Sequence, residues 1–444
     1  MLGFELDSET CFYCAKGTQP FRHDFFANAI TRDDSEFIFL QTFDIIAYAG
    51  VYCGVRKMKI TGIRDVVVPI QSAISNAFIS FAEMTVSAVA VHTDVVRDGK
   101  KVVGFGFHSN GRYAQQGILR DRIIPRLMKA QESALMNEAG TNIDPERAWQ
   151  VMMTNEKPGG HGDRSVAVGT LDMAFWDLAA KIEDLPLYEL LARRYGNGAA
   201  NPEVSVYAAG GYYYPGKDNS ALQEEMQSYL DQGYTTVKMK IGGASLAEDQ
   251  QRIEAVLKLL PSGDRLCVDA NGRFDLDVAL EYASALAPYG LRWYEEPGDP
   301  LDFKLLAEVT QASPTPIATG ENLFSTQDSR NLIRYGGLDP QTDFLQMDPA
   351  LSYGIVEYQR TLGMLRDEGW SGSRCIPHGG HQMALHVAAG LGLGGNESYP
   401  GVFLPFGGFA DSTPIRDGKV QVPEAPGIGI ELNSDLCEVF QQMV

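Results

Sequence analysis

Three carboxylate residues recur at even spacing in the second half of this 444-residue chain. Asp269, Glu295 and Glu321 follow one another at intervals of 26 residues, and each ends a short apolar or β-branched run. Carboxylates gathered in one place repel one another unless a cation neutralises them, and a set of oxygen ligands selects a hard metal, most simply Mg²⁺. One such residue alone would indicate a salt bridge or a helix cap. Three in register predict a Mg²⁺ site.

Two lysines could supply a base next to this site. Lys238 and Lys240 alternate with the apolar residues Val237, Met239 and Ile241, so both point to one face of a strand. Two ammonium groups close together and near a divalent cation lower each other's pKa, and a lysine that is neutral at neutral pH can take a proton from carbon. A solvated pair of strand lysines fits the same pattern. If Lys240 lies at the rim and faces the barrel axis, Lys238 lies just beneath it, and the apolar residues between them fit either interpretation.

Further strand ends carry groups suited to acid catalysis. Asp348 and His378 end consecutive runs, so the carboxylate can orient the imidazole ring and keep the imidazolium available as an acid. Glu397 would end the next strand, only 19 residues after His378. The alternative interpretation of Glu397 is a carboxylate in a surface turn.

The elements that must position these residues are repeats of a strand and a helix. The polar strand ends from Lys240 to His378 lie 26 to 30 residues apart, which is the length of one strand, one helix and two loops. Such repeats predict parallel strands joined by crossover helices, in a barrel or in an open sheet. A polar residue at the end of nearly every strand favours the barrel, whose carboxyl-terminal strand ends form one active-site rim. The predicted strands are 204–207, 236–240, 265–269, 293–295, 316–321, 344–348 and 374–378.

The first 200 residues have a different pattern. Residues 58–104 are typical of strands, with a hairpin turn at Asp98-Gly99, and residues 115–191 are typical of amphipathic helices. Strands followed by helices predict an α+β domain. Residues 1–57 hold three of the six cysteines and 11 of the 44 Phe, Tyr and Trp residues. We interpret them as an extension upstream of the true start or as a poorly packed tail.

Composition excludes several classes of function. The chain has 37 Lys and Arg against 57 Asp and Glu, a net charge of −20, which argues against broad contacts with nucleic-acid phosphates. No run of about 18 apolar residues is present in the sequence, so we predict no membrane span. Six cysteines in a chain of this length are too few for a disulfide framework and indicate a reducing cytoplasm.

Several of these motifs resemble those of the enolase superfamily, and in particular of its mandelate racemase subgroup. The resemblance implies an α/β fold with an N-terminal α+β capping domain over residues 58–200 and a modified (β/α)7β TIM-type barrel over residues 201–405. Residues 406–444 would return to the cap, and the chain would form a homo-oligomer. The matching pieces are Lys238-Met239-Lys240, Asp269-Ala270-Asn271, Glu295-Glu296-Pro297, Gly320-Glu321-Asn322, Asp348 and His378.

The same resemblance implies roles for individual residues. Asp269, Glu295 and Glu321 would hold Mg²⁺, Lys240 would be the base and His378 the acid. The other catalytic positions would be Lys238 and Asp348. Substrate contacts would come from Asn76, Asn110, Lys157, Lys238, Glu295, Glu321, His378 and Glu397.

Three segments, 155–162, 207–216 and 374–381, are similar to the members of the subgroup that dehydrate D-tartrate. The implied activity is dehydration of this small hydroxy dicarboxylate to oxaloacetate. Lys240 would remove the proton next to the metal-bound carboxylate, and His378 would protonate the departing hydroxyl group from the opposite face.

Other activities use the same residues. Dehydration of another acid sugar and racemisation or epimerisation of a 2-hydroxy acid need no further group at the rim. A non-catalytic acid-binding protein would be marked by the loss of a metal ligand or a lysine, and none is lost in this sequence.

Overall fold

A three-stranded antiparallel sheet opens the described part of the chain. The computed structural model describes residues 57–444 except 197 and 412, so the interpretation of residues 1–57 falls, Lys57 apart, outside the described residues. Strands β1 (Ile60–Pro69), β2 (Thr85–Arg97) and β3 (Lys100–Phe107) lie in the order β1-β2-β3. Asp98 and Gly99 form the turn between β2 and β3 with φ angles of 49° and 75°, as expected for a two-residue hairpin loop.

One long helix packs closely against this sheet. Helix α4 (Asp163–Glu183) is buried along most of its length and lies against β3 and β2. A Cβ atom on Gly104 or Gly106 of β3 would lie 2.3 Å from a carbonyl oxygen of α4, so only glycine permits this approach. The other helices between the sheet and the barrel are α1 (Gln116–Ile118), α2 (Ile124–Lys129), α3 (Pro145–Met152) and α5 (Leu187–Tyr195).

A closed ring of parallel strands forms the barrel. Strands β4 to β9 pair in chain order, and the last barrel strand, β10, pairs with β4. Between β9 and β10 the chain is extended: the Ile376 amide donates to the Leu345 carbonyl at 2.8 Å, and the Gly394 amide donates to the Cys375 carbonyl at 3.0 Å. The prediction of a barrel is therefore confirmed. Its strands are β4 (Glu203–Ala209), β5 (Val237–Lys240), β6 (Leu266–Asp269), β7 (Trp293–Glu295), β8 (Ile317–Thr319), β9 (Phe344–Leu345) and β10 (Asn396–Ser398).

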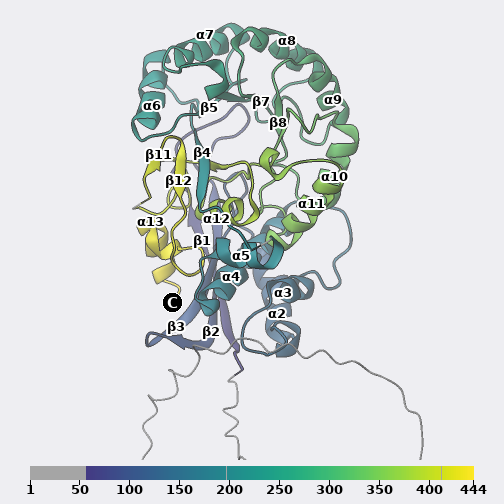
Figure 1. Cartoon of the computed structure of the whole chain (residues 1–444), viewed down its shortest axis with the longest axis vertical. Helices are drawn as coiled ribbons and strands as arrows, with labels where there is room; N and C mark the ends of the chain where they lie inside the picture. The colour runs from purple at the N-terminus through teal and green to yellow at the C-terminus, as the bar shows by residue number, and fades with distance from the viewer. Residues whose placement is uncertain (1–56, 197, 412) are drawn as a thin grey trace, which may run out of the picture. The chain divides into compact units, whose positions relative to one another are not determined.

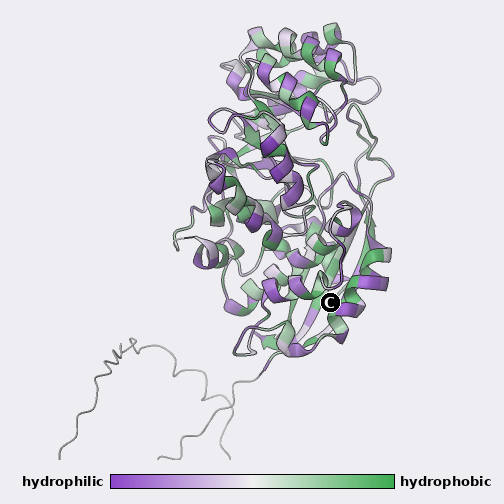
Figure 2. Cartoon of the chain, turned by 90° about the vertical axis from the view of Figure 1, so that its right-hand side faces the viewer, coloured by the Kyte–Doolittle hydropathy of each residue, from purple (hydrophilic) through white to green (hydrophobic). Residues whose placement is uncertain are grey.

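A helix follows each of the first seven strand positions, which makes the barrel a (β/α)7β arrangement. Figure 1 shows helices α6 to α11 as an arc outside the strands, and Figure 2 shows that these helices carry both hydrophilic and hydrophobic residues. Polar side chains begin several of them; Ser245 and Glu248, for example, form a reciprocal capping box on α7. The helices are α6 (Asn219–Asp231), α7 (Leu246–Leu257), α8 (Leu276–Leu286), α9 (Phe303–Ala312), α10 (Thr326–Tyr335), α11 (Ile355–Asp367) and α12 (Gln382–Leu391).

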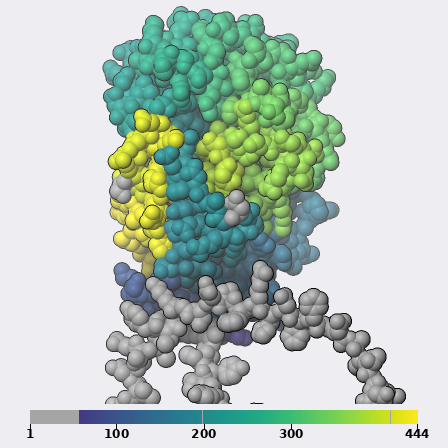
Figure 3. Space-filling model, in the orientation of Figure 1, coloured from purple at the N-terminus to yellow at the C-terminus, as the bar shows by residue number. Residues whose placement is uncertain are grey.

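The C-terminal segment runs from the barrel back to the first sheet. Strands β11 (Ile415–Arg416) and β12 (Lys419–Gln421) form a hairpin whose second strand pairs antiparallel with β4, and Figure 3 shows this segment in yellow beside the teal residues near β4. Helix α13 (Ser434–Gln441) then reaches β3, where the ring of Phe440 lies 4.8 Å from that of Phe105 and 6.5 Å from that of Phe107. Cap and barrel are thus joined by the last residues as well as by α5.

Three rim residues lie in loops and not at strand ends as expected. No named strand covers 374–378, where Cys375 alone bridges Leu345, so His378 lies in a loop. Strand β8 ends at Thr319 and β9 at Leu345, so Glu321 and Asp348 lie in the loops that follow. Gly320, with a φ of 124°, turns the chain there, and a Cβ at this position would lie 2.8 Å from the Met347 sulfur. Among the described helices, none combines the length and the apolar character needed to cross a membrane.

Candidate active site

The three evenly spaced carboxylates meet at the rim of the barrel. The strand register pairs Asp269 with Glu295 across β6 and β7, and the loop after β8 brings in Glu321. One oxygen of each residue lies within 4.8 Å of the others. Asp269 and Glu295 are fully buried, and burial together with the charge of Asp269 raises the pKa of Glu295 to about 8. Three carboxylate oxygen donors this close together fit a hard divalent cation, as the sequence predicts.

Both lysines of β5 point toward these carboxylates. Lys240 pairs in register with Asp269, and its Nζ lies 2.5 Å from Asp269 Oδ2. Lys238 lies one step deeper and contacts Glu295 at 2.5 Å, Glu397 at 2.8 Å and Asp269 at 3.3 Å. The strand alternation therefore places Lys240 at the cavity and Lys238 below it, in the order expected from the sequence.

The pKa values of the lysines differ from the expectation. Burial alone would lower the pKa of Lys240, but the negative charge of Asp269 outweighs it and raises that pKa above the usual value. Lys238 behaves in the same way, with Glu295 and Glu397 as the opposing charges. The expected mutual lowering was wrong for the protein chain by itself because each ammonium group has its own carboxylate partner, which outweighs the repulsion between the two lysines.

An imidazole lies opposite the lysines. His378 follows the extended seventh strand position, and its Nδ1 lies 2.8 Å from Asp348 Oδ2. Its Nε2 lies 3.5 Å from Glu321 and 3.0 Å from the Tyr399 hydroxyl. Burial would lower the pKa of His378, but Glu321 and Glu397, together with the hydrogen bond to Asp348, raise it to about 10. These negative charges favour the imidazolium, the form that can give up a proton.

Glu397 lies behind the reactive groups rather than in the cavity wall. Its side chain is fully buried, accepts hydrogen bonds from the Tyr399 hydroxyl at 2.7 Å and the Gly379 amide at 3.2 Å, and pairs with Lys238. Burial would raise its pKa, but Lys238 and His378 hold it at about 2. In this arrangement Glu397 orients the two cations, and its substrate contact stays a prediction.

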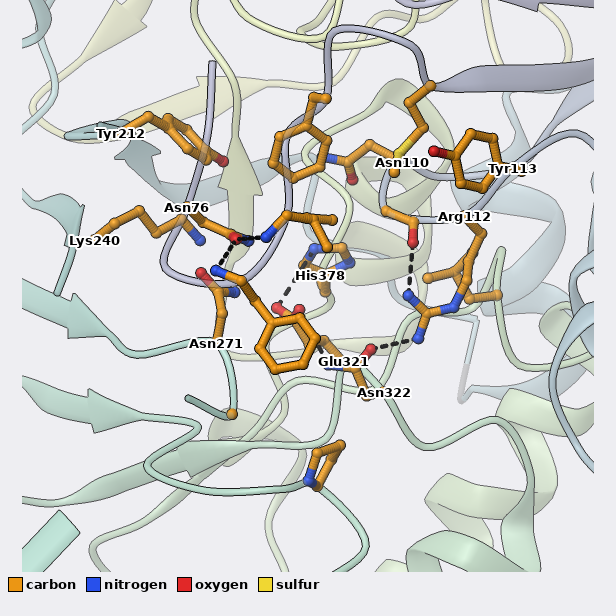
Figure 4. A pocket seen from close by; sticks show the side chains of 18 of the residues that line it. Asn76, Asn110, Arg112, Tyr113, Tyr212, Lys240, Asn271, Glu321, Asn322 and His378 are labelled. Atoms are coloured by element: carbon orange, nitrogen blue, oxygen red, sulfur yellow. Dashed lines mark hydrogen bonds and ion pairs between the residues drawn. The ribbon is translucent and has the colours of Figure 1, made fainter. Parts of the chain in front are cut away.

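A cavity of about 340 Å³ lies between the barrel rim and the cap. Lys240, Glu321 and His378 line its barrel side, and Asn76 and Asn110 line its cap side (Figure 4). The remaining lining residues are Phe78, Ile79, Phe81, Met84, Gly111, Arg112, Tyr113, Tyr212, Asn271, Gly272, Asp299, Pro300, Asn322, Leu351 and Tyr399.

Of the three substrate contacts predicted in the cap, Asn76 and Asn110 line the cavity and Lys157 does not. Asn110 is buried, and its side-chain oxygen has no hydrogen-bond partner within the described chain. Asn76 accepts from the amides of Phe78 and Ile79, at 2.8 Å each, which leaves its amide nitrogen for a ligand. Lys157 is exposed, in the loop between α3 and α4, and is not among the residues that line the cavity. Its role stays a prediction.

Comparisons with known proteins agree with this geometry. A family profile described as "Enolase C-terminal domain-like" matches residues 221–436. The 3,6-anhydro-alpha-L-galactonate cycloisomerase of Streptomyces coelicolor is 30% identical over 298 residues, which cover 65% of this chain and 76% of the relative. The chain belongs to the enolase/mandelate racemase superfamily.

Other members of the superfamily match along more of the chain. The L-talarate/galactarate dehydratase of Salmonella typhimurium is 27% identical over 368 residues, covering 82% of this chain and 86% of the relative. Among solved structures, L-talarate dehydratase from Polaromonas, complexed with Mg and L-glucarate, has a TM-score of 0.67 and 26% identity and covers 85% of this chain and 95% of its own. The predicted fold is thus confirmed, and the Mg in this similar structure agrees with the acidic triad of the described chain, whose ligand role stays a prediction.

The sequence did not predict Arg112, Glu296 and Asn322 as site residues, although all three lie at the rim or next to the cavity. Asn322 donates to both oxygens of Glu296, at 2.9 and 3.0 Å, and to Glu321 at 3.3 Å. Arg112 in turn donates to Asn322 at 2.6 Å. Glu296 follows Glu295 and Asn322 follows Glu321 in the sequence, so their position next to metal-ligand candidates could have marked them as site residues. Arg112 belongs to the cap, and only the tertiary structure brings it to the rim.

Proposed function

We propose that the enzyme dehydrates D-tartrate to oxaloacetate. The observation that carries the proposal is the placement of Lys240 and His378 on one small cavity, with the acidic triad beside them and amides on the cap side. The talarate and galactarate dehydratases among the relatives act on hydroxy diacids, which supports a substrate of this class.

Asp269, Glu295 and Glu321 would hold Mg²⁺, which several similar structures contain. When bound, the ion supplies the positive charge that stabilises the negative charge developing on a carboxylate as the neighbouring proton leaves. The residues suit it because all three donors are carboxylate oxygens and because the chain alone leaves Glu295 with a raised pKa.

Lys240 is the base in this proposal. Asp269 raises the pKa of Lys240 in the chain alone, and a Mg²⁺ ion held by Asp269 would offset that negative charge and so favour the neutral amine. In its neutral form Lys240 takes the proton from the carbon next to the carboxylate, and it lines the cavity from the end of β5. Lys238 lies below it and keeps Glu295 and Glu397 in place. Before the next turnover Lys240 releases this proton to solvent, and His378 takes up a proton from solvent to replace the one that it donates.

His378 is the acid. As an imidazolium it delivers its Nε2 proton to the hydroxyl group on the adjacent carbon, which leaves as water, while Asp348 holds Nδ1. Because Lys240 ends the second strand of the barrel and His378 follows the seventh strand position, the base and the acid flank the cavity from different parts of the rim, so in this proposal the two protons move on opposite faces of the substrate. The resulting enol tautomerises to oxaloacetate, so carbon, oxygen and hydrogen balance without any oxidant.

The test is a screen of the purified protein with Mg²⁺ against acid sugars that include D-, L- and meso-tartrate. Oxaloacetate formed from D-tartrate, lost with a chelator and restored with Mg²⁺, is the expected result. Exchange of the α-proton in D₂O without loss of water would indicate a racemase or epimerase instead. Dehydration of a different acid sugar with D-tartrate inert would replace the substrate, and binding without turnover across the panel would indicate a non-catalytic acid-binding protein.

The remaining expectations belong to the same proposal. A small hydroxy dicarboxylate is the partner, no nucleic acid or membrane is involved, and the enzyme acts in the cytoplasm as a homo-oligomer. Gel filtration with light scattering and fractionation of the source cells test the last two.

A further inference from the structure

The cap presents a guanidinium group to the cavity. Arg112 follows β3 and precedes α1, and it lines the cavity together with Asn110 and Tyr113 (Figure 4). Among the described lining residues, the other cationic groups are Lys240 and His378, both on the barrel side. Arg112 is therefore the positive charge of the cavity that the proposed proton transfers do not use.

Arg112 is held in place without a carboxylate partner. Its two terminal nitrogens donate to the Gly111 carbonyl and to Asn322 Oδ1, both at 2.6 Å, and its guanidinium lies 4.8 Å from the centre of the Phe324 ring. No carboxylate of the described chain forms an ion pair with it. A fixed guanidinium whose charge is not neutralised within the protein is suited to bind an anion through paired hydrogen bonds.

Asn322 sets Arg112 close to the reacting end of the cavity. It accepts from Arg112 through Oδ1 and donates through Nδ2 to Glu321 at 3.3 Å. One amide side chain thus separates the guanidinium from a carboxylate of the acidic triad. A short acid with a carboxylate at each end would therefore place one carboxylate at the metal site of the acidic triad and the other at the guanidinium of Arg112. Phe78 and Ile79, elsewhere on the cap wall, offer the substrate apolar side chains.

We propose that Arg112 binds the second carboxylate of the substrate and makes the enzyme selective for diacids over sugar acids that end in a hydroxymethyl group. This inference rests on the proposed function, which it deepens by naming the group that recognises the far end of the substrate. Lys157, which the sequence predicts as a substrate contact, is exposed and does not line the cavity.

The experiment compares a ligand pair that differs only at the far end. Malate and 2-hydroxybutanoate are both four-carbon 2-hydroxy acids, and only malate has a second carboxylate; their dissociation constants are measured by calorimetry with the Mg²⁺-loaded full chain. We expect the wild type to bind malate about 100-fold more tightly. Arg112→Met should bring the ratio to within about threefold of one, and Arg112→Lys should retain an intermediate preference because it keeps the charge without the fork.

Arg120→Met is the matched control, because Arg120 pairs with Asp65 outside the cavity and its loss changes the net charge by the same amount. Its ratio should equal that of the wild type. An unchanged ratio in Arg112→Met and Arg112→Lys would overturn the proposal, as would a loss of preference in Lys157→Met in place of Arg112→Met. A wild type that binds both ligands equally would also overturn it. Because the readout is binding, a failure of D-tartrate as the substrate leaves this test intact.

Discussion

On the barrel side of the active-site cavity the base and the acid of the proposed reaction are buried and paired with carboxylates, whereas the cap side consists of aromatic, aliphatic and amide side chains with one guanidinium. Lys240 touches Asp269, and His378 touches Asp348, through contacts of 2.8 Å or less. Across the cavity, Phe78 and Asn110 carry no charge. The difference indicates a division of labour in which the barrel moves protons and the cap selects the molecule on which they are moved.

The largest expected effect comes from removing the base on the barrel side. Lys240→Met should lower kcat for oxaloacetate formation by about 10⁴-fold, because no other described lysine lines the cavity. The binding of D-tartrate, measured by calorimetry, should change far less. If turnover survives at more than about a tenth of the wild-type rate, the base lies elsewhere and the division between barrel and cap does not hold.

The next effect concerns the orientation of the acid. Asp348→Asn should lower kcat by about 100-fold. The carboxylate of Asp348 raises the pKa of His378, so its loss lowers that pKa, and the protonated form is lost at a lower pH. The decline of kcat on the alkaline side should therefore begin at lower pH in the variant. A variant profile that superimposes on the wild-type profile would show that Asp348 does not act through His378.

A smaller effect is expected on the cap side. Asn110→Ala should raise KM for D-tartrate about tenfold and leave kcat within about twofold, because a single neutral hydrogen bond to the substrate is lost. Steady-state kinetics separate the two constants. A fall in kcat at constant KM would place Asn110 among the groups that act on the reaction itself and would weaken the contrast between the two sides.

His386 is a buried imidazole outside the active site, and it should affect the pH dependence of the protein's stability. His386 on α12 has no charged partner, and burial lowers its pKa to about 3. The unfolded chain takes up a proton near pH 6.5 and the folded chain does not, so this contribution to stability is present above pH 6.5 and is lost as the pH falls toward 3.

The contribution of His386 to the free energy of unfolding should fall by about 1.3 kcal/mol between pH 7.5 and pH 5.5. In His386→Gln the difference between the unfolding free energies at these two pH values should shrink by about that amount, as measured by urea denaturation. The comparison within each variant cancels the packing cost of the substitution. An unchanged difference would mean that the imidazole has the same pKa in the folded protein as in the unfolded chain.

The barrel side was largely predictable from the sequence. Asp269 and Glu295 end strands that are neighbours in both sequence and space, so their spacing along the chain reports their position at the rim. The alternation of Lys238 and Lys240 with apolar residues fixed the face on which they lie. In a regular barrel, residues at the same place in successive strand-helix repeats lie next to one another at the rim, so the spacing of the metal-ligand candidates along the chain predicts that they meet.

The cap side was not predictable in the same way. Arg112 and Lys157 are both cations in loops of the first 200 residues, and nothing periodic distinguishes the one that lines the cavity. The pKa of Lys240 likewise depends on a contact with Asp269 whose length no sequence pattern specifies. Non-repeating loops and individual charge pairs require the tertiary structure.

The contact between α13 and β3 has a consequence for the order in which the protein becomes complete. Phe440 covers Phe105 and Phe107, yet it is synthesised 333 residues after Phe107. At roughly 5–20 residues per second, that interval lasts roughly 20–70 s on the ribosome. Throughout this interval the β1-β2-β3 sheet lacks the apolar cover that α13 provides, so the packing of this early part of the chain is completed only after the barrel has been translated.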